Sequence, residues 1–137
     1  MSKKTLFFLL LALFVIGIGS FSWLQDSTVL INRAEATRRD FSVSNSYLFV
    51  TPLRAKANND EKIRITVFVL NSQGLGVPGK NVKIGLDPAL NIQVVQGITD
   101  DYGKAVYDVK AEKAGEYYLE VTIEGKKLPQ QARLSYY

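Results

Sequence analysis

Cysteine and histidine are both absent from the 137 residues. Without cysteine the chain can form no disulfide, thiolate metal site or thiol nucleophile, and it has no cysteine for N-terminal lipid attachment. Without histidine it lacks the commonest general base and the commonest transition-metal ligand. Residues 2–4 do not supply the S-x-x-K pattern of a serine–lysine nucleophile. We therefore expect no catalytic residue, no cofactor and no metal ligand, and we predict that the protein is not an enzyme.

A large excess of positive charge is also missing. The net charge is +4, from 17 Lys and Arg against 13 Asp and Glu. Residues 33–64 hold most of the excess, and the charges balance from residue 65 onward. A nearly neutral domain lacks the basic surface needed to neutralise many phosphates, so we expect no nucleic-acid partner.

The one long apolar run lies at the N-terminus. Lys3 and Lys4 precede it, and no charged residue follows until Asp26. As a helix, the roughly 19 uncharged residues would extend about 28 Å, close to the thickness of a bilayer core. Residues 1–24 are therefore either a signal peptide, cleaved near the small residues 17–22, or an uncleaved signal anchor with Trp23 at the membrane interface.

The N-terminal segment also predicts a location. Long domains cross the membrane largely regardless of their charge, so we place the C-terminal part outside the cytoplasm, although arginines follow the apolar run. The expected protein is a single-pass protein of the cell membrane, or an exported one if the signal is cleaved. Residues 25–40 show no strong period and are interpreted as a linker, in which Arg38 and Arg39 either contact anionic lipid headgroups or form part of a soluble spacer.

A period of two begins at Phe41. In residues 62–70, Ile63, Ile65, Val67 and Val69 alternate with more polar residues, which is typical of a strand with one buried face. Turn signals rich in Gly, Pro, Asn and Asp separate runs of this kind. The runs lie in residues 43–50, 62–70, 81–86, 92–95, 105–109, 117–123 and 132–137. About seven strands at this spacing, without a helical period, predict an all-β sandwich over residues 41–137, and Pro52 favours an edge position for the first strand.

Three segments carry a resemblance to a known family. They are ITVFVLNSQGLGVPGKNVKI, TDDYGKAVYDV and KAGEYYLEV, and the matching positions are Thr99, Asp100, Gly103, Ala105, Ala114, Gly115 and Tyr117. The region resembles the bacterial immunoglobulin-like domain of the invasin and intimin type (group 1), present here in a single copy. The resemblance implies an immunoglobulin-like β-sandwich and a role in adhesion at the cell envelope.

The individual residues of these motifs have structural interpretations. Tyr117 is expected to form a tyrosine corner, with its hydroxyl bonded to backbone upstream. Asp100 and Asp101, with Asp87 or residues 60–61, could supply oxygen ligands for Ca²⁺, but no D-x-D-x-D loop is present and a turn is the favoured interpretation. Some aromatic residues could lie outward, either scattered or in a shared patch: Phe68, Tyr102, Tyr118, Tyr136 and Tyr137.

Two function classes remain open. The first is a non-enzymatic interaction or adhesion module that presents one immunoglobulin-like domain to an unknown protein or glycan partner. The second is a periplasmic accessory subunit of a transport or secretion assembly, which would bind a partner's strand at its sheet edge.

Overall fold

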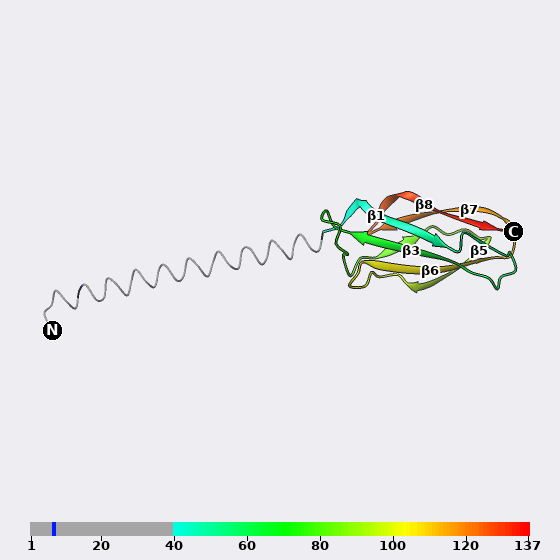
Figure 1. Ribbon diagram of the computed structural model, residues 1–137, viewed down its shortest axis with the longest axis horizontal. Helices are drawn as coiled ribbons and strands as arrows, with labels where there is room; N and C mark the ends of the chain where they lie inside the picture. Colours follow the sequence, from blue (N-terminus) through cyan, green and yellow to red (C-terminus); the bar gives the residue numbers. More distant parts are fainter. Residues whose placement is uncertain (1–6, 8–39) are drawn as a thin grey trace. The chain divides into compact units, whose positions relative to one another are not determined.

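The computed structural model describes Phe7 and residues 40–137 (Figure 1). The predicted membrane segment 1–24, apart from Phe7, and the predicted linker 25–40, apart from Asp40, lie outside the described residues. Within the described part of the chain, no helix is long and apolar enough to span a bilayer. Residues 40–137 belong to one compact unit.

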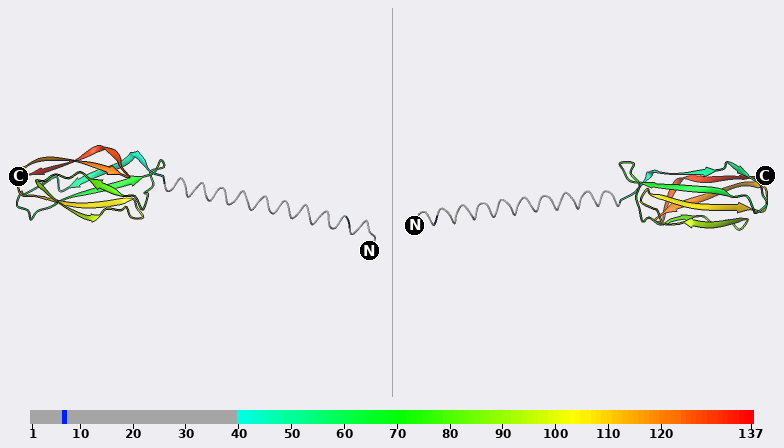
Figure 2. Two further views of the ribbon diagram at one scale, coloured as in Figure 1. Left: turned by 180° about the vertical axis from the view of Figure 1, so that it is seen from behind. Right: turned by 60° about the horizontal axis from the view of Figure 1, so that its bottom comes forward.

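Eight strands make up the described domain, and they form two four-stranded sheets facing each other (Figures 1 and 2). The first sheet has the order β1-β3-β6-β5, and the second has the order β2-β8-β7-β4. Neighbouring strands are antiparallel except β2 and β8, which are parallel. The strands are β1 (Ser42–Thr51), β2 (Arg54–Ala55), β3 (Ile63–Leu70), β4 (Val82–Ile84), β5 (Leu90–Gln96), β6 (Lys104–Ala111), β7 (Gly115–Ile123) and β8 (Lys126–Tyr136). The predicted all-β sandwich is confirmed.

The core forms between the inner faces of the two sheets. The four aliphatic residues predicted to share the buried face of β3 are all 0% exposed: Ile63, Ile65, Val67 and Val69. The opposite sheet contributes alternate residues of β7 and β8, including Leu119, Val121 and Leu134. Burying an aliphatic side chain of this size stabilises a fold by about 1.5–3 kcal/mol relative to exposure, so apolar burial accounts for a stable domain without disulfides.

Several strand boundaries differ from the predicted ones by a few residues, and two differences are larger. β8 begins at Lys126, six residues before the predicted run, because its first half pairs with β7 although Pro129, Gln130 and Gln131 are exposed and break the alternation. The two-residue β2 was not predicted, since a strand of that length has no period to detect. β1 does lie at the edge of its sheet, as Pro52 indicated.

Candidate functional site

The turn that follows Thr99 is fixed by side-chain hydrogen bonds. Asp100 Oδ1 accepts hydrogen bonds from the backbone N–H of Tyr102 at 3.0 Å and of Lys104 at 2.9 Å. Burial opposes the ionisation of Asp100, but these two backbone hydrogen bonds, together with the charge of Lys104 and a hydrogen bond from Gln96, outweigh it and lower the pKa of its carboxyl group. The predicted turn role of Asp100 is therefore confirmed.

The alternative calcium ligands lie on separate loops. Asp87 Oδ1 accepts a hydrogen bond from the N–H of Ala89, and Glu61 Oε2 accepts one from the N–H of Lys56. Across residues 40–137 the structure brings no three acidic side chains together in a group that could hold a metal ion. These carboxylates stabilise local turns by accepting backbone hydrogen bonds.

Two glycines explain why the family motif needs small residues here. Gly103 has φ +72°, and a Cβ atom on it would lie 2.2 Å from the carbonyl oxygen of Val69. A Cβ atom on Gly76 would lie 2.2 Å from the carbonyl oxygen of Tyr102. The loop before β4 and the turn before β6 therefore touch backbone to backbone, which only glycine permits.

Tyr117 forms the predicted corner. Its hydroxyl donates to the carbonyl oxygen of Lys113 at 2.9 Å, and its ring packs edge-on against Tyr136, with centroids 6.1 Å apart. The prediction that Tyr136 points outward is wrong, because it shares the inward parity of Leu134 on β8. Tyr136 is 3% exposed, donates to the carbonyl oxygen of Val109, and has a pKa raised by burial to about 12.

The sequence left two alternatives for the outward aromatic residues, scattered positions or a shared patch, and across residues 40–137 no ring contact joins two of the five candidates. Tyr102, Tyr118 and Tyr137 are exposed. Phe68 instead stacks between Tyr47 and Phe49, with centroids 5.4 and 6.0 Å apart, on the outer face of the first sheet. Cross-strand pairing of β1 with β3 produces this stack. Predicting it would have required the register between two strands about 20 residues apart, which the sequence of either strand does not give.

A buried carboxylate on the same outer face was also missed. Asp108 on β6 is 3% exposed and binds Arg64 at 2.7 and 2.9 Å and Lys62 at 2.6 Å. The hydrogen bonds from the Arg64 guanidinium, supported by Lys62, overcome burial and lower the pKa of Asp108 to about 2. The cluster holds the charged form of Asp108 and ties β3 to β6.

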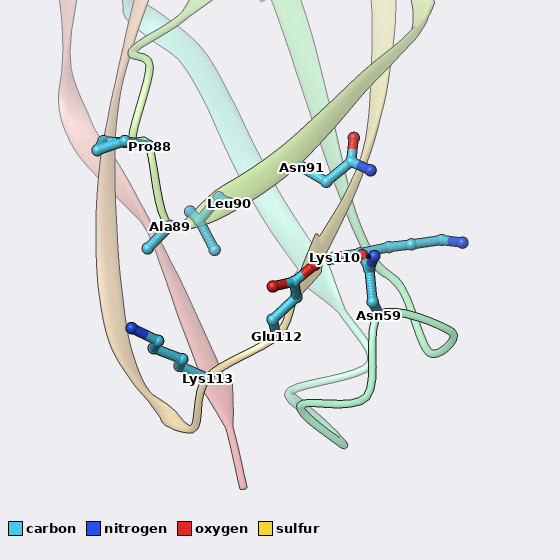
Figure 3. A pocket seen from close by; sticks show the side chains of 8 residues that line it. All are labelled: Asn59, Pro88, Ala89, Leu90, Asn91, Lys110, Glu112 and Lys113. Carbon is cyan, nitrogen blue, oxygen red and sulfur yellow. Dashed lines mark hydrogen bonds between the residues drawn. The ribbon is translucent and has the colours of Figure 1, made fainter.

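A small polar hollow lies at one end of the sandwich, between the start of β5, the end of β6 and the loop before β3 (Figure 3). It has a volume of about 300 Å³. Asn59 Nδ2 approaches Glu112 Oε1 at 3.5 Å, and Lys110 and Lys113 lie on either side of Glu112 (Figure 3). Glu112 is the one carboxylate among the residues that line this hollow. It therefore forms neither a pair of catalytic acid and base nor a set of metal ligands there.

A larger groove runs along the seam where the edges of the two sheets meet. We call it the seam groove; it has a volume of about 690 Å³. Its β1 side carries Leu48 and Phe49, with Leu53 following, and its β8 side carries Arg54, Glu116 and Arg133. Arg133 Nε donates to Glu116 Oε2 at 2.9 Å, and hydrogen bonds from Ser135 and Arg133 lower the pKa of the Glu116 carboxyl group. The groove combines exposed apolar surface with charged side chains.

A second, mainly apolar hollow of about 470 Å³ lies between the opposite edge strands, β4 and β5. Val82 N–H donates to the carbonyl oxygen of Gly97 at 2.9 Å, and the buried hydroxyl of Tyr107 donates to the carbonyl oxygen of Val82. These bonds occupy the outward backbone groups of Val82, so part of the β4 edge is already closed.

Comparison with known proteins places these observations in a family context. Residues 45–135 match the sequence profile of the bacterial Ig-like domain (group 1). No curated protein sequence is significantly similar to the chain.

Solved structures share the fold at low sequence identity. The InvE adhesin of Yersinia pseudotuberculosis aligns with a TM-score of 0.59 at 20% identity, over 72% of this chain and 28% of that one. Invasin, described as a bacterial integrin-binding protein, aligns with a TM-score of 0.61 at 17% identity, over 70% and 19%. The Escherichia coli adhesin FdeC aligns with a TM-score of 0.57 at 18% identity, over 71% and 32%. The chain thus matches less than a third of the length of each of these structures.

Proposed function

Since the chain belongs to the family of bacterial Ig-like domains (group 1), we propose that it is a non-enzymatic interaction or adhesion module of the cell envelope. The observation that carries the proposal is the family match over residues 45–135, and adhesins among the structures of the same fold support it. The motif residues Asp100, Gly103 and Tyr117 are engaged in turns and packing, which suits a rigid carrier whose exposed surface does the binding.

We further propose that residues 1–24 hold the domain at the membrane, with residues 41–137 outside the cytoplasm. Lys3 and Lys4 followed by an uncharged span of membrane length support this placement. A domain held in this way is presented to an external protein or glycan partner.

The placement is tested with the full chain carrying a C-terminal epitope in a bacterial host. The protein should sediment with membranes, and protease added to spheroplasts should remove the epitope while a cytoplasmic marker survives. Protection of the epitope until the cells are lysed would contradict the placement.

The interaction role is tested by capture from detergent-solubilised membranes and by binding to arrays of extracellular proteins and glycans. Saturable binding to one external ligand, retained after the N-terminal segment is replaced by an unrelated anchor, is the expected result. Capture of transport or secretion components would favour the accessory-subunit alternative. Turnover in a broad hydrolase screen would contradict a non-enzymatic module.

A further inference from the structure

β5 is the outermost strand of the first sheet, beside β6 (Figure 2). Its other side borders the apolar hollow between β4 and β5. The two strands meet where Val82 N–H donates to the carbonyl oxygen of Gly97, and residues 85–89 join them at the opposite end. Between these points they belong to different sheets and no ladder links them. The edge of β5 is therefore open where the two strands diverge.

The backbone of β5 alternates between the β6 ladder and this open edge. The carbonyl oxygen of Gly103 accepts a hydrogen bond from Val69 N–H, so the odd-numbered residues of β6 face β3 and the even-numbered ones face β5. Gln93 opposes an even-numbered residue of β6 and belongs to that ladder. Ile92 and Val94 therefore direct their N–H and C=O groups outward, and within residues 40–137 no turn or side-chain hydrogen bond uses these groups.

Neither charge nor proline protects this edge. Residues 89–99 contain no charged residue and no proline, whereas the other sheet has Arg54 and Lys83 on its two edge strands. Charged residues on an edge strand discourage pairing with a second chain. The apolar side chains beside the β5 edge are accessible, with Val94 62% and Ile98 61% exposed. An uncharged strand with apolar side chains is thus the guest that this edge accepts.

β5 is itself a strand of this chemistry, and a twofold axis at Gln93 matches it to its own copy. Antiparallel pairing about that axis sets Ile92 opposite Val94 of the second copy, and Val94 opposite Ile92 of the second copy. Each such pair exchanges two backbone hydrogen bonds, so the two pairs make about four. No like charges meet, and the pairing ends before the register shift between Val94 and Gln96. The inward side chains of the second copy's strand then cover the hollow between β4 and β5.

We propose that β5 is a self-association edge, at which two copies of the chain pair their β5 strands antiparallel about Gln93. The first sheets of the two copies then form one continuous sheet of eight strands. The contact is small, so the expected dimer has a dissociation constant of roughly 1–100 µM. The inference goes beyond the proposed interaction role, because the occupant is the chain itself and not an external ligand.

Sedimentation velocity of the full chain in detergent, from about 1 to 500 µM, should show a dimer that increases with concentration. Detergent is used because an antiparallel pair has the Asp40 ends of its two domains facing in opposite directions, which one flat membrane would oppose. Val94→Pro removes an outward N–H from each copy and should abolish the dimer in this range. The circular dichroism spectrum should stay the same, because that N–H lies outside the β6 ladder.

A pair of charge variants tests the register. Gln93 meets Gln93 of the second copy at the axis, so Gln93→Lys sets two lysines opposite each other and Gln93→Glu sets two glutamates. Like charges directly opposite destabilise a strand pair, so each variant alone should weaken the dimer several-fold. An equal mixture of the two should form a heterodimer at least as readily as the wild type. Gln131→Lys, on β8 in the other sheet, is the matched control and should leave dimerisation unchanged.

Cysteine crosslinking tests the same register by distance. The chain has no cysteine of its own, so an introduced one is unique. Gln93 and its copy form a non-hydrogen-bonded pair, with Cα atoms about 4.5 Å apart, which a disulfide can span. Gln93→Cys should therefore give a crosslinked dimer under mild oxidation. Asn91→Cys lies exposed on the same strand but about 13 Å from its own copy, so it should stay uncrosslinked.

Three outcomes would overturn the proposal: a monomer at every concentration, a dimer that survives both Val94→Pro and Gln93→Lys, or equal crosslinking at positions 91 and 93. The second outcome would place the contact elsewhere in the chain. None of them bears on the proposed interaction role, since a monomer that captures an external ligand would still be an interaction module.

Discussion

Asp108 and Arg64 form a two-point ion pair across the ladder between β3 and β6, with Oδ1 to Nε at 2.7 Å and Oδ2 to Nη2 at 2.9 Å. The pKa of Asp108 falls to about 2 from an ordinary value of 3.8. The folded state therefore binds this proton less tightly than the unfolded state does. The stabilisation is complete above about pH 5 and is lost as the pH falls through 2.

We predict that this pair contributes about 2 kcal/mol to the free energy of unfolding at neutral pH. Asp108→Asn should remove that increment and flatten the decline in stability between pH 4 and pH 2. Urea unfolding across this range measures both effects. Asp101→Asn, at an exposed carboxylate, is the control and should keep the wild-type decline; an equally acid-sensitive Asp108→Asn variant would contradict the assignment.

The fragment of residues 41–137 is expected to fold on its own, with a circular dichroism spectrum of sheet and little helix. Within it, Ile65→Ala should lower the free energy of unfolding by about 2–5 kcal/mol, because Ile65 is fully buried between the sheets. Leu86→Ala is the matched control at a side chain that is 92% exposed, and it should cost under about 0.5 kcal/mol. Similar losses in the two variants would mean that the buried face of β3 is assigned wrongly.

Gly103→Ala is predicted to lower the free energy of unfolding by at least about 2 kcal/mol. The added Cβ atom would clash with the carbonyl oxygen of Val69, and alanine would also have to adopt a positive φ. Gly125→Ala separates these two effects. Gly125 has φ +79° with nothing within 4 Å of a Cβ atom, so that substitution should cost only the roughly 1 kcal/mol of a left-handed backbone. Chemical denaturation of both variants compares the costs, and equal values would rule out the close approach as the cause.

Calcium is predicted to leave the stability of the domain unchanged. A ligand that binds only the native state raises its stability, by about 2.7 kcal/mol at a hundredfold excess over its dissociation constant. Asp100 Oδ1 is already occupied by two backbone N–H groups. Melting the 41–137 fragment with EDTA and again with millimolar Ca²⁺ should give the same midpoint, and a rise of several degrees with calcium would point to the turn at Asp100.

The sequence indicated the features that depend on local pattern. The alternation in residues 62–70 predicted the buried face of β3. The position of Tyr117 predicted a hydroxyl bond to upstream backbone, which the structure places at Lys113, and both relationships extend over only a few residues. The seam groove could not be predicted in the same way. It joins Leu48 to Gln130, which are 82 positions apart, and depends on how β1 and β8 lie along the open side of the sandwich.

The burial of Asp108 is a related case. An alternating strand predicts an outward residue there, and β6 does direct it to the outer face. Arg64 and Lys62 then cover it from the neighbouring strand, so that an outward residue becomes almost inaccessible. Pairing between strands, which a single run cannot reveal, decided its environment.

The described domain begins and ends at opposite ends of the sandwich. β1 starts at one end of the domain, and Tyr137 lies at the other (Figure 1). Tension applied between these points runs nearly parallel to the strands, while the hydrogen bonds between β1 and β3 lie across it. The hydrogen bonds of that ladder would be loaded in shear and would have to break together, instead of one after another. A domain loaded in this way is expected to resist unfolding by the applied force.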